Sequence, residues 1–340
     1  MMPRLSIVTT ILFAVIALLL SSALRADNPS ELLKNTEVRR FIHQMVTQHD
    51  YSQEHLMALM ERVRIVPALL KPSVPKEALP WYRYRTIFVT GHRAKAGVRF
   101  WQTYRDTLAR AERIHGVPSE IIVAILGVES YFGNHKGKYP VLNSLVTLAF
   151  HAPKRRKFFL RELEQFLLLI REEKGFDVHG LKGSYAGAMG LPQFISSSYR
   201  RYAVDFDGDN SRDLIGNIAD SIGSVANFLA EHGWNKDGGI VIPAKLTDDA
   251  RVNVLVKRGI KPHIAFSTLK NYGVVIADSE IPPDERVSLI KLSAKTGPMY
   301  WVGRSNFYTI TRYNHSKLYA MAVYQLAEAI RKRYTRGKNS

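Results

Sequence analysis

A carboxylate interrupts an apolar helix face near the middle of the chain. Residues 118–133 are predicted to form a helix, because a Pro-Ser pair suits its start and a glycine suits its end. Ile122, Ile125, Leu126 and Glu129 follow the i, i+3, i+4, i+7 spacing of one helix face. Glu129 is therefore predicted to point inward, among apolar side chains.

Burial at this position favours the protonated form of Glu129. An ionised carboxylate against Ile and Leu loses solvation, and near the C-terminal end of a helix it meets the negative pole of the macrodipole. A carboxyl that keeps its proton near neutral pH suits a general acid. The alternative is a structural Glu that pairs with an Arg or Lys across a core boundary, and this pattern alone leaves both open.

The N-terminal residues have the pattern of a secretory signal. Arg4 precedes an apolar run over residues 5–20, and Ala23 and Ala26 suit cleavage. We predict a signal peptide over residues 1–26. An uncleaved inner-membrane anchor is the alternative, because the run is nearly long enough to span a bilayer. In either case the rest of the chain is expected to be exported, since no second long apolar run follows.

Composition limits the classes of function. The absence of cysteine from all 340 residues excludes a disulfide framework, thiol catalysis, cysteine metal sites and a lipoprotein anchor. The net charge of +18 favours an anionic partner: nucleic acid, acidic lipid or an acidic polymer of the cell envelope. Export favours the envelope polymer, and no nucleic-acid-binding motif is present.

Periodicity predicts a mainly helical α+β chain with a small inserted sheet. A Pro-rich stretch, 66–91, is predicted to be an extended connection, and 180–192 a loop. Further helices are expected at 38–48, 53–63, 98–115, 139–150, 155–174, 218–232 and 316–332. Strands are expected at 240–242, 272–276, 287–292 and 300–313. We predict one catalytic region, 27–335, with its β-rich part at about 239–313.

A segment rich in Gly and Ala, residues 183–194, is a candidate ligand-binding loop. Small side chains allow a ligand or another backbone to approach closely, and Ser184 and Gln193 offer hydrogen bonds. The alternative is a packed turn between helices, which composition alone does not exclude.

Acidic residues alternate over residues 205–220. Asp205, Asp207 and Asp209 occupy positions one, three and five of a loop that suits Ca²⁺, and Ser211 at position seven would contribute its backbone carbonyl. Position twelve is a glycine, so Asp220, at the start of a helix, is the candidate for the remaining carboxylate. The alternative is a solvated acidic turn.

Several motifs occur together and in order. They are 127–130 (GVES), 183–194 (GSYAGAMGLPQF), the acidic residues of 205–213 and 313–316 (YNHS). The set closely resembles the membrane-bound lytic murein transglycosylase B family. The resemblance extends from the first mature helices to the C-terminal helix.

This resemblance implies a lysozyme-like helical core with accessory helical and β subdomains, acting on peptidoglycan glycan strands in a Gram-negative periplasm. It implies that Glu129 is the single catalytic acid/base, and that Ser184, Gln193, Asn314 and Tyr319 contact the glycan. The residues Asp205, Asp207, Asp209, Ser211 and Asp220 match the family's structural calcium loop. It also suggests a monomer that works beside enzymes of cell-wall synthesis or remodelling.

One carboxylate suffices for the implied reaction, because the 2-acetamido group of the sugar can act as an internal nucleophile. The expected products carry 1,6-anhydromuramoyl ends, from cleavage of the β-1,4 bond between N-acetylmuramic acid and N-acetylglucosamine. Two alternatives remain at this point. One is a goose-type lysozyme that uses water, and the other is a non-catalytic, calcium-stabilised wall-binding protein in which Glu129 is structural.

Overall fold

The computed structural model describes residues 29–337, except 73, 174 and 278–279. The predicted signal segment, 1–26, therefore lies outside the described residues. Within the described residues, the helices are all too short or too polar to cross a membrane.

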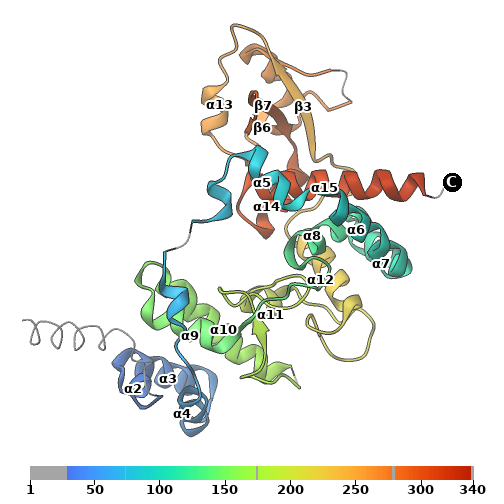
Figure 1. Ribbon diagram of the computed structural model, residues 1–340. Helices are drawn as coiled ribbons and strands as arrows, with labels where there is room; N and C mark the ends of the chain where they lie inside the picture. The colour runs from blue at the N-terminus through green and yellow to red at the C-terminus, as the bar shows by residue number, and fades with distance from the viewer. Residues whose placement is uncertain (1–28, 73, 174, 278–279, 338–340) are drawn as a thin grey trace, which may run out of the picture.

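Helices dominate the fold, as the sequence predicts, and a small sheet completes it (Figure 1). The mainly α, α+β class is thereby confirmed. The α-helices are α2 Pro29–Lys34, α3 Thr36–His49, α4 Gln53–Glu61, α5 Trp81–Phe88, α6 Gly91–Thr103, α7 Arg105–His115, α8 Ser119–Ser130, α9 Val141–His151, α10 Arg156–Glu172, α11 Ser196–Tyr202, α12 Ile218–Glu231, α13 Asn253–Lys257, α14 Ser305–Tyr313 and α15 Lys317–Arg336. Short 3-10 helices are η2 Pro67–Leu70, η3 Lys76–Ala78, η4 Pro153–Arg155 and η5 Phe266–Tyr272.

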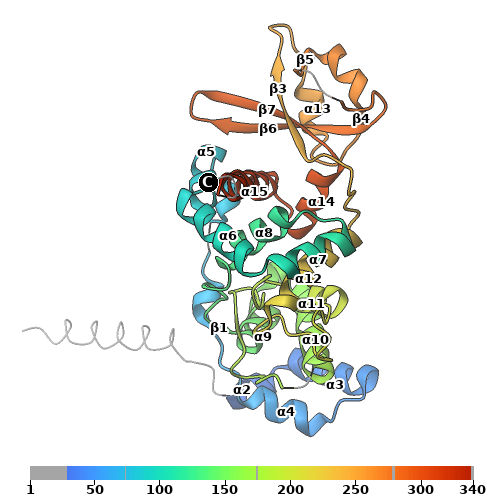
Figure 2. The same cartoon turned by 90° about the vertical axis from the view of Figure 1, so that its right-hand side faces the viewer.

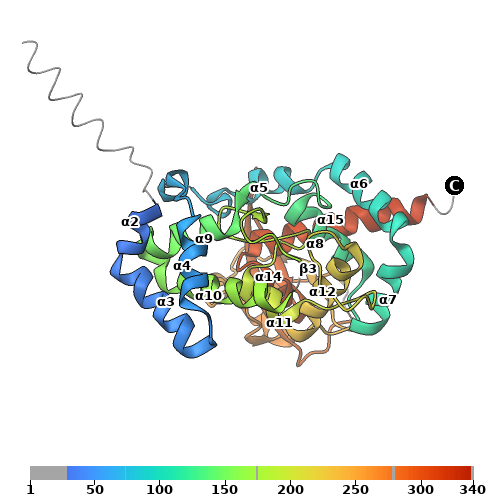
Figure 3. The ribbon, with the colours of Figure 1, turned by 90° about the horizontal axis from the view of Figure 1, so that it is seen from below.

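The molecule has three tiers along its long axis (Figure 2). The sheet forms one end, and α5 to α8 with α12, α14 and α15 form the middle. The other end holds α9 to α11 and the N-terminal helices α2 to α4, which lie against α10 when seen from below (Figure 3). The connection from α4 to α5 runs between these ends (Figure 1) and so brings early residues beside the middle tier.

Helix α8 lies at the centre of the middle tier, where it packs against α6, α7, α12 and α15. Its residues are buried except for Glu120 and Glu129, which are half-buried. Full burial of an Ile or Leu side chain contributes about 1.5–3 kcal/mol, so this helix is a large part of the core. Because α8 is so deeply buried, only a few of its positions can carry a polar side chain.

The sheet is antiparallel, with strand order β4-β6-β7-β3-β5. Its strands are β3 Val241–Leu246, β4 Ile264–Ala265, β5 Val274–Val275, β6 Arg286–Ala294 and β7 Gly297–Gly303. A separate two-stranded pair joins β1 Tyr139–Pro140 to β2 Lys182–Gly183. Strand β6 is buried on both faces: Val287 and Leu289 join a small core of the β-rich part, whereas Ile290 and Leu292 join the main core. The sheet is thus packed onto the helical body.

The largest differences from the sequence prediction concern three of the predicted elements. The stretch 66–91, predicted to be extended, contains η2, η3 and α5, because Pro is tolerated at the first positions of a helix, as at Pro67. The predicted helix 98–115 is two helices that meet at Tyr104. The predicted strand 300–313 ends at Gly303 and continues as α14, whose apolar face packs on α15 and α12. In this segment, packing against neighbouring helices outweighs the β propensity of its residues.

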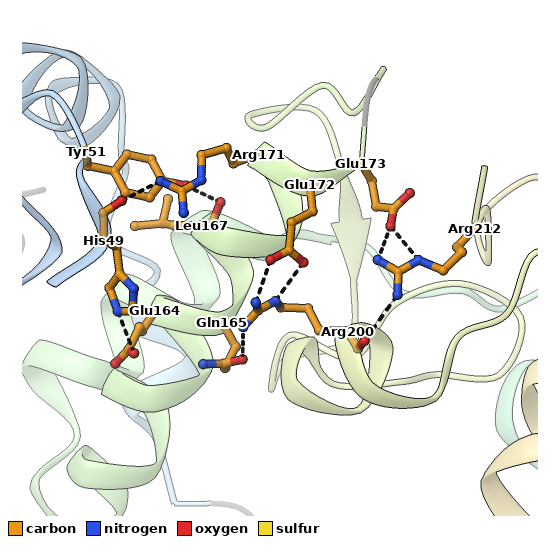
Figure 4. Close-up of polar contacts among 10 residues, drawn as sticks. All are labelled: His49, Tyr51, Glu164, Gln165, Leu167, Arg171, Glu172, Glu173, Arg200 and Arg212. Carbon is orange, nitrogen blue, oxygen red and sulfur yellow. Dashed lines mark hydrogen bonds and ion pairs between the residues drawn. The ribbon is translucent and has the colours of Figure 1, made fainter. Parts of the chain in front are cut away.

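Charged side chains join the N-terminal helices to α10, α11 and the acidic loop (Figure 4). Nε2 of His49 and Oε1 of Glu164 lie 3.0 Å apart. Arg200 of α11 donates from Nε to Glu172 over 2.9 Å, and Arg212 of the acidic loop donates from Nε to Glu173 over 2.6 Å. The C-terminal half of α10, with Glu173 that follows it, therefore contacts α3, α11 and the acidic loop.

Candidate active site

The end of helix α8 positions Glu129. The helix begins at Ser119, whose backbone and hydroxyl groups both donate to Glu112 Oε2, over 3.1 and 2.7 Å. It ends at Ser130 and is followed by Tyr131 and Phe132, which both have left-handed backbone, with φ of 53° and 58°. Such backbone is costly for residues other than glycine and persists where the surroundings enforce it. Glu129 therefore lies in a last turn that is fixed on both sides.

A tyrosine hydroxyl contacts the Glu129 carboxylate. Tyr319, on α15, donates from its hydroxyl to Glu129 Oε1 over 2.6 Å. Within the described part of the chain, Glu129 has no Lys, Arg or His nitrogen within 4.0 Å of its carboxylate. The described residues therefore do not support the structural alternative, in which Glu129 pairs with a basic residue.

The surroundings of Glu129 favour its protonated form. Burial raises its pKa, the hydrogen bond from Tyr319 lowers it, Glu77 raises it and Lys76 lowers it. The balance brings the pKa from 4.5 to about 7. This direction agrees with the sequence analysis, and loss of hydration is the main cause in both. A pKa near neutrality suits a carboxyl that must both give and accept a proton.

Three tyrosines surround the carboxylate. Tyr313 and Tyr319 stack with ring centroids 6.3 Å apart and an interplanar angle of 11°. Burial raises the pKa of Tyr84, and the negative charges of Glu77 and Glu129 raise it further. Burial and the charge of Glu129 likewise raise the pKa of Tyr313 and Tyr319. These phenols therefore stay neutral and act as hydrogen-bond donors.

The Gly- and Ala-rich segment forms a folded loop beside this cluster. Ser184 Oγ accepts from the amides of Ala186 and Ala188, over 3.3 and 3.0 Å. Gln193 has left-handed backbone, with φ of 52°, and its side-chain amide donates to the carbonyls of Lys136 and Gly190 over 3.1 and 2.8 Å. Both predicted contact residues thus also hold the loop in shape.

The structure brings some of the predicted substrate residues together. Tyr319 contacts Glu129 directly, and Tyr313 donates to the carbonyl of Pro192 over 2.5 Å, which joins the loop to the tyrosine cluster. Asn314 follows Tyr313 and is exposed. Ser184 lies at the opposite end of the loop from Gln193, and no contact connects it directly to Glu129 among the described residues.

The acidic loop gathers three carboxylates. Asp205, Asp207 and Asp209 each offer an oxygen, and these atoms lie within 4.8 Å of one another. Asp205 accepts from the backbone amides of Gly208, Asp209 and Asn210 over 2.7, 3.2 and 2.8 Å. Loss of hydration raises the pKa of Asp205, but the three amides outweigh it and the pKa is lowered. The lowered pKa favours the ionised form of Asp205, and hard oxygen donors at this separation suit Ca²⁺.

Asp220 stands apart from this cluster. It is buried at the start of α12, and its two oxygens accept from the amides of Phe206 and Asp213 over 2.7 and 2.8 Å. The carboxylate thus ties the two ends of the loop together. Its predicted role as a metal ligand stays a prediction, as does the backbone carbonyl of Ser211.

Comparison with known proteins assigns the family. A model of the transglycosylase SLT domain matches residues 34–328. The membrane-bound lytic murein transglycosylase B of Escherichia coli (strain K12) is 40% identical over 313 residues, covering 88% of this chain and 84% of that protein.

The chain belongs to the transglycosylase SLT domain family. It is a peptidoglycan lytic transglycosylase. This assignment disfavours the goose-type lysozyme and the non-catalytic wall-binding protein that the residues alone left open.

Solved structures of relatives have the same fold as this transglycosylase. The catenated lytic transglycosylase SltB1 from Pseudomonas aeruginosa is 42% identical, with a TM-score of 0.83 over 88% of this chain and 98% of that chain. The Escherichia coli lytic transglycosylase Slt35, solved in complex with calcium, is 40% identical, with a TM-score of 0.80 over 88% and 94%. The predicted lysozyme-like core is thereby confirmed.

Sequence reasoning missed Tyr84, Tyr313 and Glu77 in this transglycosylase. Tyr313 begins the YNHS motif, so its place beside Asn314 was a usable signal. Tyr84 and Glu77 lie in the Pro-rich stretch that was predicted to be extended, more than 40 residues before Glu129 in the sequence. The chain runs from α4 to α5 in the middle tier (Figure 1), and Glu77 and Tyr84 are near enough to Glu129 to interact with it electrostatically.

Proposed function

We propose that Glu129 is the single acid/base of this lytic transglycosylase. The observation that carries the proposal is a carboxyl that has no basic partner among the described residues. It accepts one hydrogen bond, from Tyr319, and its pKa is raised to about 7. General acid and base catalysis are most efficient when the pKa lies near the working pH.

In the first step, the protonated Glu129 gives its proton to the glycosidic oxygen as the bond from the muramoyl anomeric carbon to that oxygen breaks. The acetamido carbonyl oxygen bonds to the anomeric carbon and takes up its positive charge. The N-acetylglucosamine side leaves as an alcohol. The hydroxyl of Tyr319 stabilises the carboxylate that forms.

In the second step, the Glu129 carboxylate removes the proton from the muramoyl O6. This oxygen bonds to the anomeric carbon and displaces the acetamido oxygen, which gives a 1,6-anhydro ring. The proton returns to Glu129, so the enzyme is restored and no water is consumed.

We further propose that Ser184, Gln193, Asn314 and Tyr319 contact the glycan. The Gly- and Ala-rich loop supports this role, because it lacks bulky side chains and is joined to the tyrosine cluster through Pro192 and Tyr313. Lytic transglycosylase SltB3 from Pseudomonas aeruginosa, 27% identical with a TM-score of 0.76 over 86% of this chain and 78% of its own, was solved with NAG-NAM-pentapeptide. A strand that carries peptide stems is therefore the substrate that we propose.

The acidic loop is proposed to hold a structural Ca²⁺. Asp205, Asp207 and Asp209 would supply carboxylate oxygens, with the Ser211 carbonyl and Asp220 completing the ligands. The clustered carboxylates support this role, as does the calcium complex of Slt35. When bound, the ion would neutralise the cluster and stabilise the loop. The reaction steps above use only Glu129.

The proposed place of action is the periplasm, where the signal-like segment 1–26 would direct the chain. Peptidoglycan, the substrate, lies in this compartment. Fusion of residues 1–26 to a reporter that is active only after export tests this localisation.

The mass of the muropeptide products tests the proposed reaction. Products that lack one water relative to the hydrolysed reducing ends are expected from purified peptidoglycan. A digest that contains only the heavier, hydrolysed ends would contradict the transglycosylase mechanism and would favour the goose-type lysozyme alternative.

A further inference from the structure

A polar cavity lies one turn away from the Glu129–Tyr319 pair. It has a volume of about 330 Å³ and is formed where three parts of the fold meet: η3 with the start of α5, strand β6, and the junction of α14 with α15. The side chains that matter most are Glu77, Lys291, Ser293, His315, Ser316 and Lys317. Nothing in the proposed mechanism uses this cavity.

Two lysines give the cavity a positive excess. Lys291 and Lys317 are both half-buried. Burial lowers the pKa of Lys317, and the nearby charge of Lys291 lowers it further. Among the described residues, neither ammonium group has a carboxylate oxygen within 4.0 Å. Ammonium groups that lose hydration without a counter-ion are costly, so the pair favours an incoming anion.

Helix α15 connects this cavity to the acid. Ser316, which lines the cavity, accepts at Oγ from the amides of Leu318 and Tyr319 over 3.2 and 3.4 Å. The side chain of Tyr319 donates to Glu129. Glu77 also lines the cavity, and its charge raises the pKa of Glu129, which places both groups within electrostatic range. An anion held by the lysines is therefore close to the bond that Glu129 cleaves.

The proposed substrate offers one class of anion. Its sugar rings are neutral. Where a stem is attached, the lactyl carboxyl is a neutral amide and the carboxylates lie on the stem; where the stem is absent, the lactyl arm itself carries a carboxylate. Glu77 is exposed and carries the opposite charge to the lysines, but two ammonium groups outnumber it. A compact carboxylate would restore the neutral balance of the cavity and could also accept from the hydroxyls of Ser293 and Ser316.

We propose that Lys291 and Lys317 bind a carboxylate of the muramoyl unit, on its lactyl arm or its peptide stem, and thereby place the scissile bond at Glu129. This inference rests on the proposed peptidoglycan substrate. It makes the two lysines specificity-determining residues that act on substrate binding and leave the proton transfers to Glu129.

The test compares the double variant Lys291→Met/Lys317→Met with a matched control, Lys245→Met/Lys257→Met. The control removes the same charge from exposed positions of the β-rich part. KM and kcat are measured on glycan strands with peptide stems and on strands from which an amidase has removed the stems. Loss of two charged contacts is expected to raise KM about tenfold, with kcat at saturation within about twofold of the wild type.

The two substrates identify the carboxylate. An increase in KM on stem-bearing strands alone assigns the site to a stem carboxylate. An increase on amidase-treated strands alone assigns it to the lactyl carboxylate, which is free only after the stem is removed, and an increase on both shows that the site accepts either carboxylate. An unchanged KM on both strands, relative to the control, overturns the proposal. Lys291→Arg/Lys317→Arg keeps both charges and is expected to retain most of the affinity. If the Met variant folds poorly, Lys291→Gln/Lys317→Gln removes the same charges and gives the answer in its place.

Failure of this inference is distinct from failure of the proposed function. If the wild-type enzyme releases no anhydromuramoyl products from either substrate, the proposed function is wrong. If the products form and KM is the same in the double variant and the control, only the proposed carboxylate site is wrong.

Discussion

Glu129 and the acidic loop at Asp205 are both anionic regions of this transglycosylase, but their carboxylates meet different surroundings. Glu129 is half-buried in the last turn of an apolar helix, and one phenol contacts it. Asp205 accepts three backbone amides and has two further carboxylates nearby. The first carboxyl has its pKa raised and the second has its pKa lowered.

The difference shows that lost hydration and hydrogen-bond donors together decide the charge of a carboxylate here. The acid position provides little hydration and a single donor, so a proton is retained. The loop provides three backbone donors to Asp205, which favour its ionised form, and carboxylate oxygens gathered in this way suit a cation. The same chemical group thus serves proton transfer in one region and metal binding in the other.

The largest expected effect comes from Glu129→Gln. Removal of the only proposed acid/base should lower kcat on peptidoglycan by about 10³-fold or more, because both proposed proton transfers use Glu129. Release of soluble muropeptides measures this loss, and circular dichroism checks that the fold is kept.

Glu120→Gln is the matched control, since Glu120 lies in the same helix and is also half-buried. It should retain near wild-type activity. Equal losses in both variants would show that the helix tolerates no amide, and lytic activity that survives in Glu129→Gln would assign Glu129 a structural role.

Glu129→Gln should also stabilise the folded protein at high pH. With its pKa raised from 4.5 to about 7, Glu129 keeps its proton in the folded state while the unfolded chain ionises. Stability relative to Glu129→Gln is therefore lost as the pH rises from about 4.5 to 7, by up to about 3 kcal/mol. Denaturant unfolding of both proteins at pH 4 and pH 8 measures this difference. A constant difference at the two pH values would contradict the raised pKa.

Removal of calcium should act on stability, with catalysis retained while the protein remains folded. At calcium concentrations 100 times its Kd, binding would contribute about 2.7 kcal/mol, which corresponds to a Tm increase of about 5 °C. Thermal unfolding with calcium or a chelator measures this shift, and Asp205→Asn/Asp207→Asn should abolish it. Loss of catalysis on chelation at unchanged Tm would instead give calcium a part in the reaction.

The smallest expected effect comes from Tyr319→Phe. Its hydroxyl favours the ionised form of Glu129, so its removal should raise the pKa of Glu129 and lower kcat about tenfold. The pH–rate profile should move to higher pH. Tyr313→Phe removes a bond to the Pro192 carbonyl and should leave the midpoint of the profile in place. Equal shifts in both variants would mean that the cluster acts through packing.

Much of the middle tier could be predicted from the sequence, because helix periodicity is local. The spacing of Ile122, Ile125, Leu126 and Glu129 was sufficient to predict an inward-facing acid, and the raised pKa agrees with it. Tyr319 was identified through the family resemblance. Its contact with Glu129 spans 190 residues, a distance in sequence over which no local pattern carries information.

The remaining site depends on chain path. Glu77 and Tyr84 reach the acid through a proline-rich connection whose prolines precede or begin short helices, a pattern that also suits an extended chain. The aromatic and β-branched residues of 305–313 suggest a strand, but contacts with α12 and α15 form a helix there and place Tyr313 beside Tyr319. Such contacts are decided by packing, which sequence patterns do not encode locally.

An NMR titration of carboxyl carbons tests the central claim most directly. Protein labelled with ¹³C at its carboxyl groups would be titrated beside Glu129→Gln, which identifies the Glu129 signal by its absence. The Glu129 signal should shift with a midpoint near pH 7, while that of Asp205 should have a midpoint below its usual range. A Glu129 midpoint near 4.5 would contradict the account, because an acid that is ionised at neutral pH has no proton to give.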